Sequence, residues 1–335
     1  MKPHELAEDR VIIIDKPPGL TSHEVTTYVK KIIGANRSGH AGTLDPEVSG
    51  VLPVAIGRAT KLLRYIAGKD KTYVGIIKFK VPQTKEGIVR LFAEFVGEIT
   101  QTPPKISAVR KVARKRTVYY LKLLETGGQV AASHKPAGLH GNPAHRNRPA
   151  ISIASSSAGA EGRMPETGDG MPVTWRVALF ETKVDAGTYI RTLCEDIGEK
   201  CGGARMEELR RTAVGNITEK EAHGMYGLVD AVWLMKSKND DTELRKMLAE
   251  PQKLIGLKKA WVKESALKNI LSGAQVMVPA VEKIGDVKKG ERVAVYSGSL
   301  FVGVGVMQIA GEDFQHKKKG PAVKMERVHL PKKEG

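Results

Sequence analysis

A stretch rich in glycine, proline and hydroxyl side chains carries the carboxylate of Asp45; residues 40–52 read His-Ala-Gly-Thr-Leu-Asp-Pro-Glu-Val-Ser-Gly-Val-Leu. Loops that hold an acid between rigid elements are frequent places for chemistry. Pro46 directs the backbone of Asp45 toward extended geometry. The same pattern also suits a tight turn in which the aspartate bonds its own backbone. The stretch alone leaves both interpretations open.

Two residues far from Asp45 in the sequence have side chains that a carboxylate nucleophile would need. A carboxylate can form a covalent intermediate at an electrophilic carbon, but it must stay ionised in a pocket that excludes water. Arg191 could supply the fixed positive charge, because a guanidinium binds a carboxylate at two points. Tyr73 offers a flat ring for stacking on a flipped base and a phenol that could move a proton. Each also has a plain structural alternative: Tyr73 as a core aromatic of a strand, and Arg191 as a surface charge of a helix.

Predicted elements on both sides of the loop would hold Asp45 in place. Residues 10–14 form an apolar run that predicts a buried strand. Thr21 and Glu24 have the spacing of a capping box, and the helix that they begin ends at Gly34. The apolar run 51–56 follows the loop. Asp45 therefore lies between a helix and a buried segment.

Tyr73 and Arg191 lie on separate predicted elements. Tyr73 is near the start of a predicted strand over 72–79, and Arg191 is in the first turn of a predicted helix over 189–200. Residues 205–212, rich in arginine and glutamate, predict a short basic helix. The strands predicted over 117–125 and 175–184 could pair as a hairpin.

Residues 127–174 interrupt this regular pattern. Glycine, alanine, proline and serine dominate the segment, and no helical or strand period persists, so we expect a flexible insertion at the tip of the hairpin. Its histidines lack cysteine or carboxylate partners at ligand spacing, so a structural zinc site is not expected. A spacer with some affinity for RNA is the simpler interpretation.

The C-terminal part has a different texture, with short predicted strands separated by glycine and lysine turns. This spacing favours a small barrel. A boundary near 251–255 divides the chain into domains 1–251 and 252–331.

The charge balance points to nucleic acid. The chain has 54 Lys and Arg against 37 Asp and Glu, which gives 54 − 37 = +17, and its pI is near 9.7. Such a charge attracts polyanions. Six basic residues between positions 105 and 116 predict a phosphate-binding patch, with an ordinary solvated face as the alternative. They are Lys105, Arg110, Lys111, Arg114, Lys115 and Arg116.

Several classes of protein are not supported. The sequence has no phosphate-binding Gly-x4-Gly-Lys-Ser/Thr loop, no complete dinucleotide fingerprint, no Gly-x-Ser-x-Gly elbow and no His-Glu-x-x-His motif. No apolar run approaches the ~20 residues of a membrane-spanning helix. The two cysteines cannot build a disulfide framework, which suits a reducing interior. We therefore expect a cytoplasmic protein.

Four motifs in order resemble those of TruB-type pseudouridine synthases. The stretch 40–52 resembles the family signature, and Lys16-Pro17-x-Gly19-x-Thr21-Ser22 resembles the family's first motif. Lys71-Thr72-Tyr73 resembles its tyrosine motif, and the stretch from Gly187 to Leu193 resembles its arginine motif. The resemblance covers roughly residues 10–126 and 175–232. It implies an α+β fold: a catalytic domain on a mixed, mainly antiparallel sheet with flanking helices, followed by a small β-barrel-like PUA domain.

The resemblance also implies roles for individual residues. Asp45 would be the nucleophile, Arg191 would keep it charged, and Tyr73 would stack on the base and take the proton from its C5. Substrate-binding positions would be His40, Thr43, Tyr189, Leu193 and Lys16. The family requires neither a metal nor an organic cofactor.

Further details resemble the archaeal and eukaryotic dyskerin branch of the family. These are Ser22-His23-Glu24, His40-Ala41-Gly42 and PUA-like motifs such as Trp261-Val262-Lys263 and Val278-Pro279. Proteins of this branch are the catalytic subunits of H/ACA guide-RNA particles. The resemblance thus implies guide RNA, an rRNA or tRNA substrate and small particle proteins as partners, without membrane or DNA.

Two alternatives stay open: a stand-alone synthase for the tRNA T-loop, and a non-catalytic RNA-binding scaffold. Two departures from the branch also matter. The insertion over 127–174 falls where the branch carries its substrate-holding loop, and the region before the first motif is short for the branch.

Overall fold

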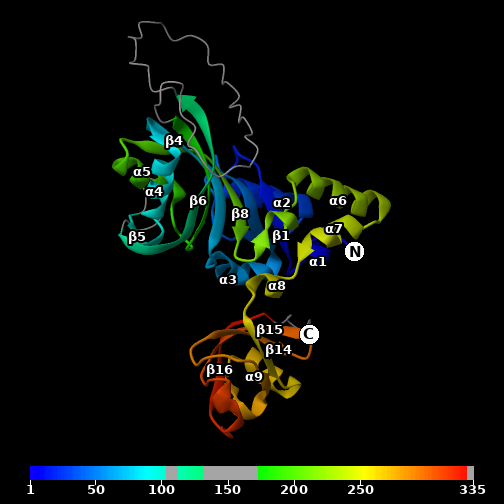
Figure 1. Ribbon diagram of the computed structural model, residues 1–335. Helices are drawn as coiled ribbons and strands as arrows, with labels where there is room; N and C mark the ends of the chain where they lie inside the picture. The colour runs from blue at the N-terminus through cyan, green and yellow to red at the C-terminus, as the bar shows by residue number, and fades with distance from the viewer. Residues whose placement is uncertain (103–111, 131–172, 330–335) are drawn as a thin grey trace, which may run out of the picture.

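The computed structural model describes residues 1–102, 112–130 and 173–329, which form two sheets with their helices (Figure 1). The strands of the larger sheet are β1 (Val11–Lys16), β2 (Ser38–His40), β3 (Ser49–Ile56), β4 (Lys71–Thr84), β5 (Gly97–Gln101), β6 (Arg114–Val130), β7 (Thr174–Val184), β8 (Ala204–Val214), β9 (Ile217–Thr218) and β10 (Leu248–Ala249). The helices of this part are α1 (Pro3–Ala7), α2 (Ser22–Ile33), α3 (Leu63–Ala67), α4 (Lys85–Ala93), α5 (Ile190–Lys200), α6 (Met225–Lys238), α7 (Thr242–Met247) and α8 (Pro251–Ile255).

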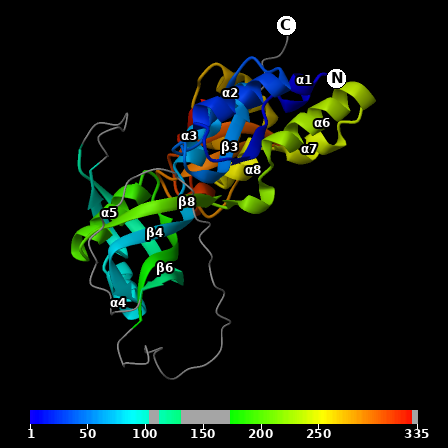
Figure 2. The same cartoon turned by 90° about the horizontal axis from the view of Figure 1, so that it is seen from above.

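The larger sheet has two halves that join where β3 pairs with β8. The β1–β3 half contains β10, β1, β3 and β2, and the β4–β6 half contains β8, β4, β7, β6, β5 and β9. The order of the whole sheet is β10-β1-β3-β8-β4-β7-β6-β5, with β2 beside β3 and β9 beside β8. Its pairings are antiparallel except between β3 and β8, which run parallel over two residues of each strand. Helices α4 and α5 lie with the β4–β6 half, and α2, α6 and α7 with the β1–β3 half (Figure 2). The predicted mixed, mainly antiparallel sheet is confirmed.

The apolar runs around the Asp45 loop form central strands that are buried on both faces. In β3, Leu52 and Val54 pack under α2 and α6, whereas Val51 and Ala55 face a second core on the opposite side. Burial on both faces explains why the run is continuous rather than alternating. The predicted capping box at Thr21 and the left-handed cap at Gly34 bound α2 as expected. These elements flank the loop on both sides.

The prediction of a helix over 205–212 was wrong, because these residues belong to β8. Methionine, leucine, glutamate and arginine favour helices locally, which explains the error. In the folded chain, β4 pairs along most of β8, and β3 pairs with Arg210 and Arg211. Tertiary pairing therefore overrides the local preference.

The predicted hairpin is confirmed, since β6 and β7 pair antiparallel. Strand β6 continues to Val130, so the insertion predicted over 127–174 begins too early: residues 127–130 belong to the hairpin. The flexibility predicted for 131–172 concerns residues outside the described part of the chain.

The smaller sheet confirms the expected barrel-like C-terminal fold. Its order is β12-β16-β15-β14-β11-β13. Its elements are β11 (Lys258–Val262), β12 (Val276–Met277), β13 (Val281–Ile284), β14 (Arg292–Ser297), β15 (Leu300–Met307), β16 (Pro321–Val328) and α9 (Leu267–Leu271). Ala294, Phe301 and Val304 share a buried cluster with Ile255 and the β1–β3 half. The two sheets are thus packed against each other.

Candidate active site

Asp45 lies in the loop between β2 and β3, next to the seam where the two halves of the sheet meet. Ser22 Oγ holds this loop, because it accepts a hydrogen bond from the Leu44 N–H at 2.8 Å and donates one to the Leu44 carbonyl at 3.0 Å. Leu44 and Val48 are buried on either side of Asp45. The exposed carboxylate is therefore carried by a loop with buried anchors.

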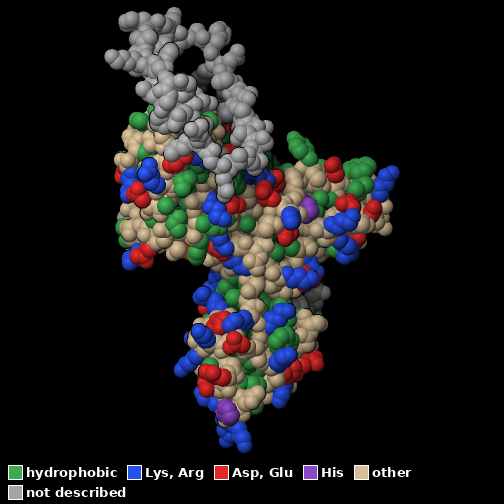
Figure 3. Space-filling model, in the orientation of Figure 1, with side chains coloured by type: hydrophobic (Ala, Val, Ile, Leu, Met, Phe, Trp, Pro, Cys, Tyr) green, Lys and Arg blue, Asp and Glu red, His purple; other side chains and the backbone are tan. Residues whose placement is uncertain are grey.

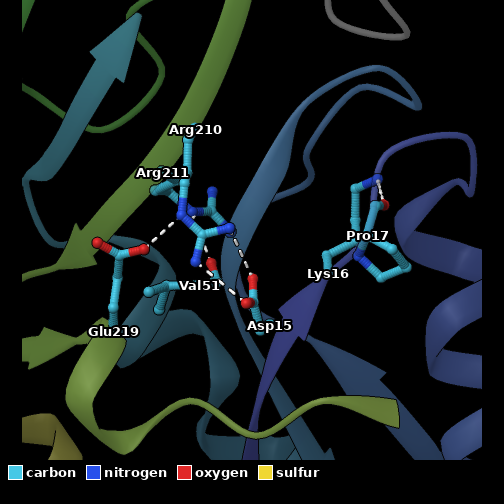
Figure 4. Close-up of polar contacts among 7 residues, drawn as sticks. All are labelled: Asp15, Lys16, Pro17, Val51, Arg210, Arg211 and Glu219. Atoms are coloured by element: carbon cyan, nitrogen blue, oxygen red, sulfur yellow. Dashed lines mark hydrogen bonds and ion pairs between the residues drawn. The ribbon is translucent and has the colours of Figure 1, made fainter. Parts of the chain in front are cut away.

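Lys16 also holds the loop that carries Asp45. Its side chain is fully buried, and its Nζ donates to the carbonyls of Pro17 at 2.9 Å, Leu20 at 2.5 Å and Pro46 at 3.0 Å. Figure 4 shows the contact with Pro17. Burial lowers the pKa of Lys16, while the charge of Asp45 opposes that shift. Three acceptors satisfy the three protons of an ammonium. This geometry suits a residue that positions the loop rather than one that contacts substrate.

Arg191 and Asp45 contact each other although 146 residues separate them. Arg191 Nη2 donates to Asp45 Oδ2 at 2.6 Å. Gln101 fixes the residue before α5, because its amide accepts from the Tyr189 N–H at 3.0 Å and donates to the Tyr189 carbonyl at 3.2 Å. The side chains of Asp45 and Arg191 are 55% and 43% exposed, so the water-excluding pocket expected from the sequence is not closed in this structure.

The Tyr73 ring lies in the core beneath the loop. Tyr73 is only 7% exposed and belongs to the same buried cluster as Leu44, Val48 and Leu193. Its strand pairs with Arg211 on one side and with Thr182 on the other. The structure thus brings Tyr73, Leu193, Asp45 and Arg191 to one region of the seam.

Arg211 is a component of the site that the sequence analysis missed. Its side chain is fully buried; Nε donates to the Val51 carbonyl and Nη2 to the Gly42 carbonyl, both at 2.8 Å. Burial lowers its pKa, and the nearby Tyr73 hydroxyl opposes the shift. Within the described residues, Nη1 has no hydrogen-bond partner. The misassigned strand concealed this residue: Leu209 and Arg211 are two residues apart, so in a strand they lie on the same face, and both are buried.

A second buried cation lies beside Arg211. Lys71 Nζ donates to the carbonyls of Ala67 at 2.6 Å and Lys69 at 2.5 Å. Burial and then the charge of Arg211 lower the pKa of Lys71 to about 8. Gly42 has φ +76°, and a Cβ there would lie 3.2 Å from Arg211 Nη1 and 3.4 Å from Lys71 Cε. The positive φ favours glycine at this point of the loop, and a Cβ there would also crowd Arg211.

Two threonines hold the ring of His40, the last residue of β2. Its Nδ1 lies 3.0 Å from Thr26 Oγ1, and its Nε2 lies 3.3 Å from the Oγ1 of the exposed Thr43. Burial lowers the pKa of His40, and the charges of His23 and Arg211 lower it further. A neutral imidazole beside Thr43 can accept or donate a hydrogen bond at the mouth of the site.

The predicted basic patch is only partly described. Lys105, Arg110 and Lys111 lie outside the described residues. Arg114, Lys115 and Arg116 lie at the start of β6, where Lys115 Nζ is 2.7 Å from a Glu98 carboxylate oxygen. The Arg116 guanidinium lies against Gly187, three residues before α5. One edge of this patch therefore adjoins the segment that carries Arg191.

Family models match three successive parts of the chain. Residues 30–125 match the N-terminal domain of TruB family pseudouridylate synthase, 191–254 match the tRNA pseudouridylate synthase B C-terminal domain, and 258–329 match the PUA domain. The chain is 37% identical over 326 residues to a probable tRNA pseudouridine synthase B of Pyrobaculum calidifontis, covering 96% of this chain and 84% of that one. The protein of the same name from Methanocaldococcus jannaschii is 36% identical over 333 residues, covering 98% and 85%.

Solved structures give the same result over the whole chain. A chain of a Cbf5-Nop10-Gar1 complex has TM-score 0.79 and 33% identity, covering 99% of this chain and 88% of that one. A chain of an H/ACA RNP bound to a substrate RNA containing 2′-deoxyuridine has TM-score 0.77 and 32% identity, covering 98% and 90%. The fold is that of a pseudouridine synthase, an isomerase. The chain belongs to the TruB family and is of the TruB/Cbf5 type.

No helix among the described residues has the length and apolar character needed to cross a membrane.

Proposed function

We propose that the chain converts uridine to pseudouridine in RNA with Asp45 as nucleophile. The Asp45 carboxylate attacks the target uridine, the bond between N1 and the ribose breaks, and the freed uracil rotates. Its C5 then bonds to the same ribose carbon, and the bond that Asp45 had formed breaks and frees the carboxylate. C5 loses a proton and N1 gains one, so substrate and product are isomers. The contact of 2.6 Å between Arg191 and Asp45 is the observation that carries this proposal.

The charges around Asp45 support this role. Arg191 meets the carboxylate directly, and the buried Lys16 ammonium lies near enough to interact with it. Positive charges fixed beside a carboxylate favour its ionised form, most strongly once a bound base has displaced water. We propose that the bound RNA closes the open site and that Arg191 then keeps Asp45 charged.

The residues beneath and around the loop take the other roles in this proposal. Tyr73 would stack on the flipped base and accept the C5 proton, although its ring must become accessible from a position that is 7% exposed. His40 and Thr43 would guide the base at the mouth, and Leu193 and Tyr189 would line the pocket. Lys16 would act by positioning the loop.

An isotope-release assay tests the reaction. The purified protein is incubated with guide RNA and with substrate RNA tritiated at uridine C5. The wild-type chain should release tritium, and Asp45→Ala should not. Glu47→Gln is the matched control, since Glu47 is an exposed carboxylate two residues along the same loop. Absence of release by the wild type, or undiminished release by Asp45→Ala, contradicts the proposal.

We further propose that the chain acts as the catalytic subunit of an H/ACA guide-RNA particle on rRNA, and on tRNA as well. The likeness over nearly the whole chain to chains of a Cbf5-Nop10-Gar1 complex and of a substrate-bound H/ACA RNP supports this assignment. Small proteins of such a particle would be its partners, residues 1–251 its catalytic domain, and residues 252–331 its RNA-binding domain.

A stand-alone tRNA pseudouridine synthase is the second candidate, because the curated relatives are named probable tRNA pseudouridine synthase B. Mapping pseudouridines after guide depletion separates the two: a guide-dependent enzyme loses its sites, and a stand-alone enzyme keeps them. A non-catalytic scaffold, the third candidate, would form no pseudouridine in RNA, whether or not guide RNA is present.

A further inference from the structure

Arg211 lies directly opposite Tyr73 where β8 pairs with β4. Side chains that face each other in an antiparallel pair lie on the same side of the sheet, with their Cβ atoms about 5 Å apart. The register shifts immediately beside this pair, so that Thr212 of β8 has no partner in β4. Such bulges redirect side chains and are frequent beside active sites. The strand pairing therefore places a guanidinium next to the ring that we assign to the flipped base.

Two of the three nitrogens of this guanidinium hold the backbone around Asp45. Nε donates to the Val51 carbonyl and Nη2 to the Gly42 carbonyl, both at 2.8 Å. The third nitrogen, Nη1, is buried and has no hydrogen-bond partner among the described residues. Because a buried N–H group without an acceptor costs free energy, it calls for an explanation. The pair of strands thus carries one fixed, unused donor on the side chain opposite Tyr73.

The Tyr73 hydroxyl is close enough to act on Arg211. Burial lowers the pKa of Arg211, and the interaction with the Tyr73 hydroxyl opposes that shift. Lys71, the neighbouring buried cation, behaves differently: burial and the charge of Arg211 lower its pKa, and Asp70 opposes the shift. Lys71 Nζ also donates to two backbone carbonyls. Of these two cations, Arg211 is therefore the one that interacts with the phenol.

The strand on the other side of β4 supplies no replacement for this donor. Thr182 of β7 pairs with Tyr73 and is fully buried. Its Oγ1 already donates to the Tyr120 carbonyl at 2.8 Å. Since a hydroxyl has one proton to donate, Thr182 has none left for the phenol oxygen. Among the two residues that pair with Tyr73, Arg211 is thus the available donor.

The burial of Arg211 sets it apart from the cations that can contact RNA phosphates. Figure 3 shows Lys and Arg side chains over both parts of the molecule, where they can meet a polyanion. The Arg211 side chain is 0% exposed. Its unused N–H group can therefore act only on groups inside the site.

We propose that Arg211 is a positioning residue for Tyr73: its Nη1–H donates to the Tyr73 oxygen when the target base enters, and so holds that oxygen toward C5. The Tyr73 oxygen then takes the C5 proton while it releases its own proton to water. N1 takes a proton from water, so the phenol is restored and the protons balance. This inference rests on the proposed function, because it names the residue that orients the proposed proton acceptor.

Substrate RNA with hydrogen or deuterium at C5 of the target uridine isolates the step in question. In single-turnover reactions Arg211→Lys should lower the rate about tenfold or more, because a misplaced proton acceptor loses part of its contribution to catalysis. The ratio of the hydrogen rate to the deuterium rate should rise above the wild-type ratio, because removal of the C5 proton becomes slower. The affinity for substrate RNA should be unchanged, since Arg211 does not reach the surface.

Lys71→Met is the matched control, because it removes the other buried cation next to Gly42. It should leave the isotope ratio at the wild-type value, whatever it does to the rate. Thermal melting verifies that both variants are folded; Arg211→Lys is chosen because it keeps a positive charge at this buried position.

A measurement without turnover separates this inference from the proposed function. The tyrosines are replaced by 3-fluorotyrosine, and Tyr73→Phe identifies the fluorine resonance of position 73. In RNA complexes of Asp45→Asn, adding Arg211→Lys should shift this resonance and adding Lys71→Met should not. A shifted resonance together with a wild type that releases no tritium would contradict the proposed function but not the contact between Arg211 and Tyr73. An unchanged resonance and isotope ratio in folded Arg211→Lys, or equal changes in Arg211→Lys and Lys71→Met, would overturn the inference.

Discussion

Arg211 donates a hydrogen bond of 2.8 Å to the carbonyl of Gly42, which ties the middle of β8 to the loop that carries Asp45. The same guanidinium holds Val51 of β3 (Figure 4). One buried side chain therefore connects the two halves of the sheet at the point where the proposed nucleophile lies.

Arg211→Ala should destabilise the fold by about 2–4 kcal/mol, because it removes the donor from the carbonyls of the buried Val51 and the half-buried Gly42. Arg210→Ala is the comparison: Arg210 bonds Asp15 and Glu219, but all three are partly exposed. We expect it to cost about 1 kcal/mol or less. Urea unfolding followed by circular dichroism measures both, and similar losses in the two variants would contradict the role assigned to Arg211.

Gly42→Ala should reduce both stability and turnover more than Gly34→Ala does. The two glycines have nearly the same backbone angle, φ +76° and +75°, so the backbone strain is matched. A Cβ at Gly34 meets nothing within 4 Å, whereas one at Gly42 meets Arg211 and Lys71. Thermal melting and initial rates of tritium release give the comparison. Equal losses of stability and turnover in the two variants would show that the packing of Arg211 and Lys71 against the loop affects neither quantity.

Lys71 should make stability depend on pH in a defined window. Its pKa is lowered to about 8 in the folded chain from a reference value of 10.5, so the unfolded chain binds the proton more strongly between these values. The free energy of unfolding therefore rises with pH across that window, by about 3 kcal/mol at most. Below pH 8 the Lys71 side chain is charged in both the folded and the unfolded chain, and the free-energy cost of burying that charge is fully present.

Lys71→Met removes this titration. The free energy of unfolding of the wild type should rise relative to that of the variant between about pH 8 and 10.5. Measurements by urea unfolding at several pH values determine the difference. Curves that run parallel would show that Lys71 keeps an ordinary pKa in the folded chain.

Arg191→Ala should abolish turnover while changing stability by about 0.5 kcal/mol or less, because both partners of its ion pair are substantially exposed. Lys200→Ala on the same helix removes a comparably exposed pair with Glu94 and should leave turnover intact. Single-turnover rates and melting curves distinguish the effects. Normal turnover in Arg191→Ala would mean that Asp45 needs no fixed cation.

Much of the fold could be predicted because its signals are local. The capping box at Thr21, the cap at Gly34 and the apolar runs of β1 and β3 each depend on neighbours in the sequence. The α5 helix and the β6–β7 hairpin were likewise visible as periodic segments. The sequence motifs then identified the residues that lie close together where β3 pairs with β8.

What the sequence did not reveal depends on contacts between distant segments. Strand β8 consists of helix-forming residues, and only its pairing with β3 and β4 makes it a strand. Arg211 was hidden by that error. The burial of Lys16 and the exposure of the Asp45–Arg191 pair follow from tertiary packing that no local pattern records.

The nucleoside composition of substrate RNA after reaction tests most directly whether Asp45 is the nucleophile. RNA treated with wild type, Asp45→Asn or Glu47→Gln is digested to nucleosides and separated by liquid chromatography. We expect wild type and Glu47→Gln to form pseudouridine and Asp45→Asn, though folded, to form none. Pseudouridine formed by Asp45→Asn at the wild-type rate would contradict the central claim that this carboxylate is the nucleophile.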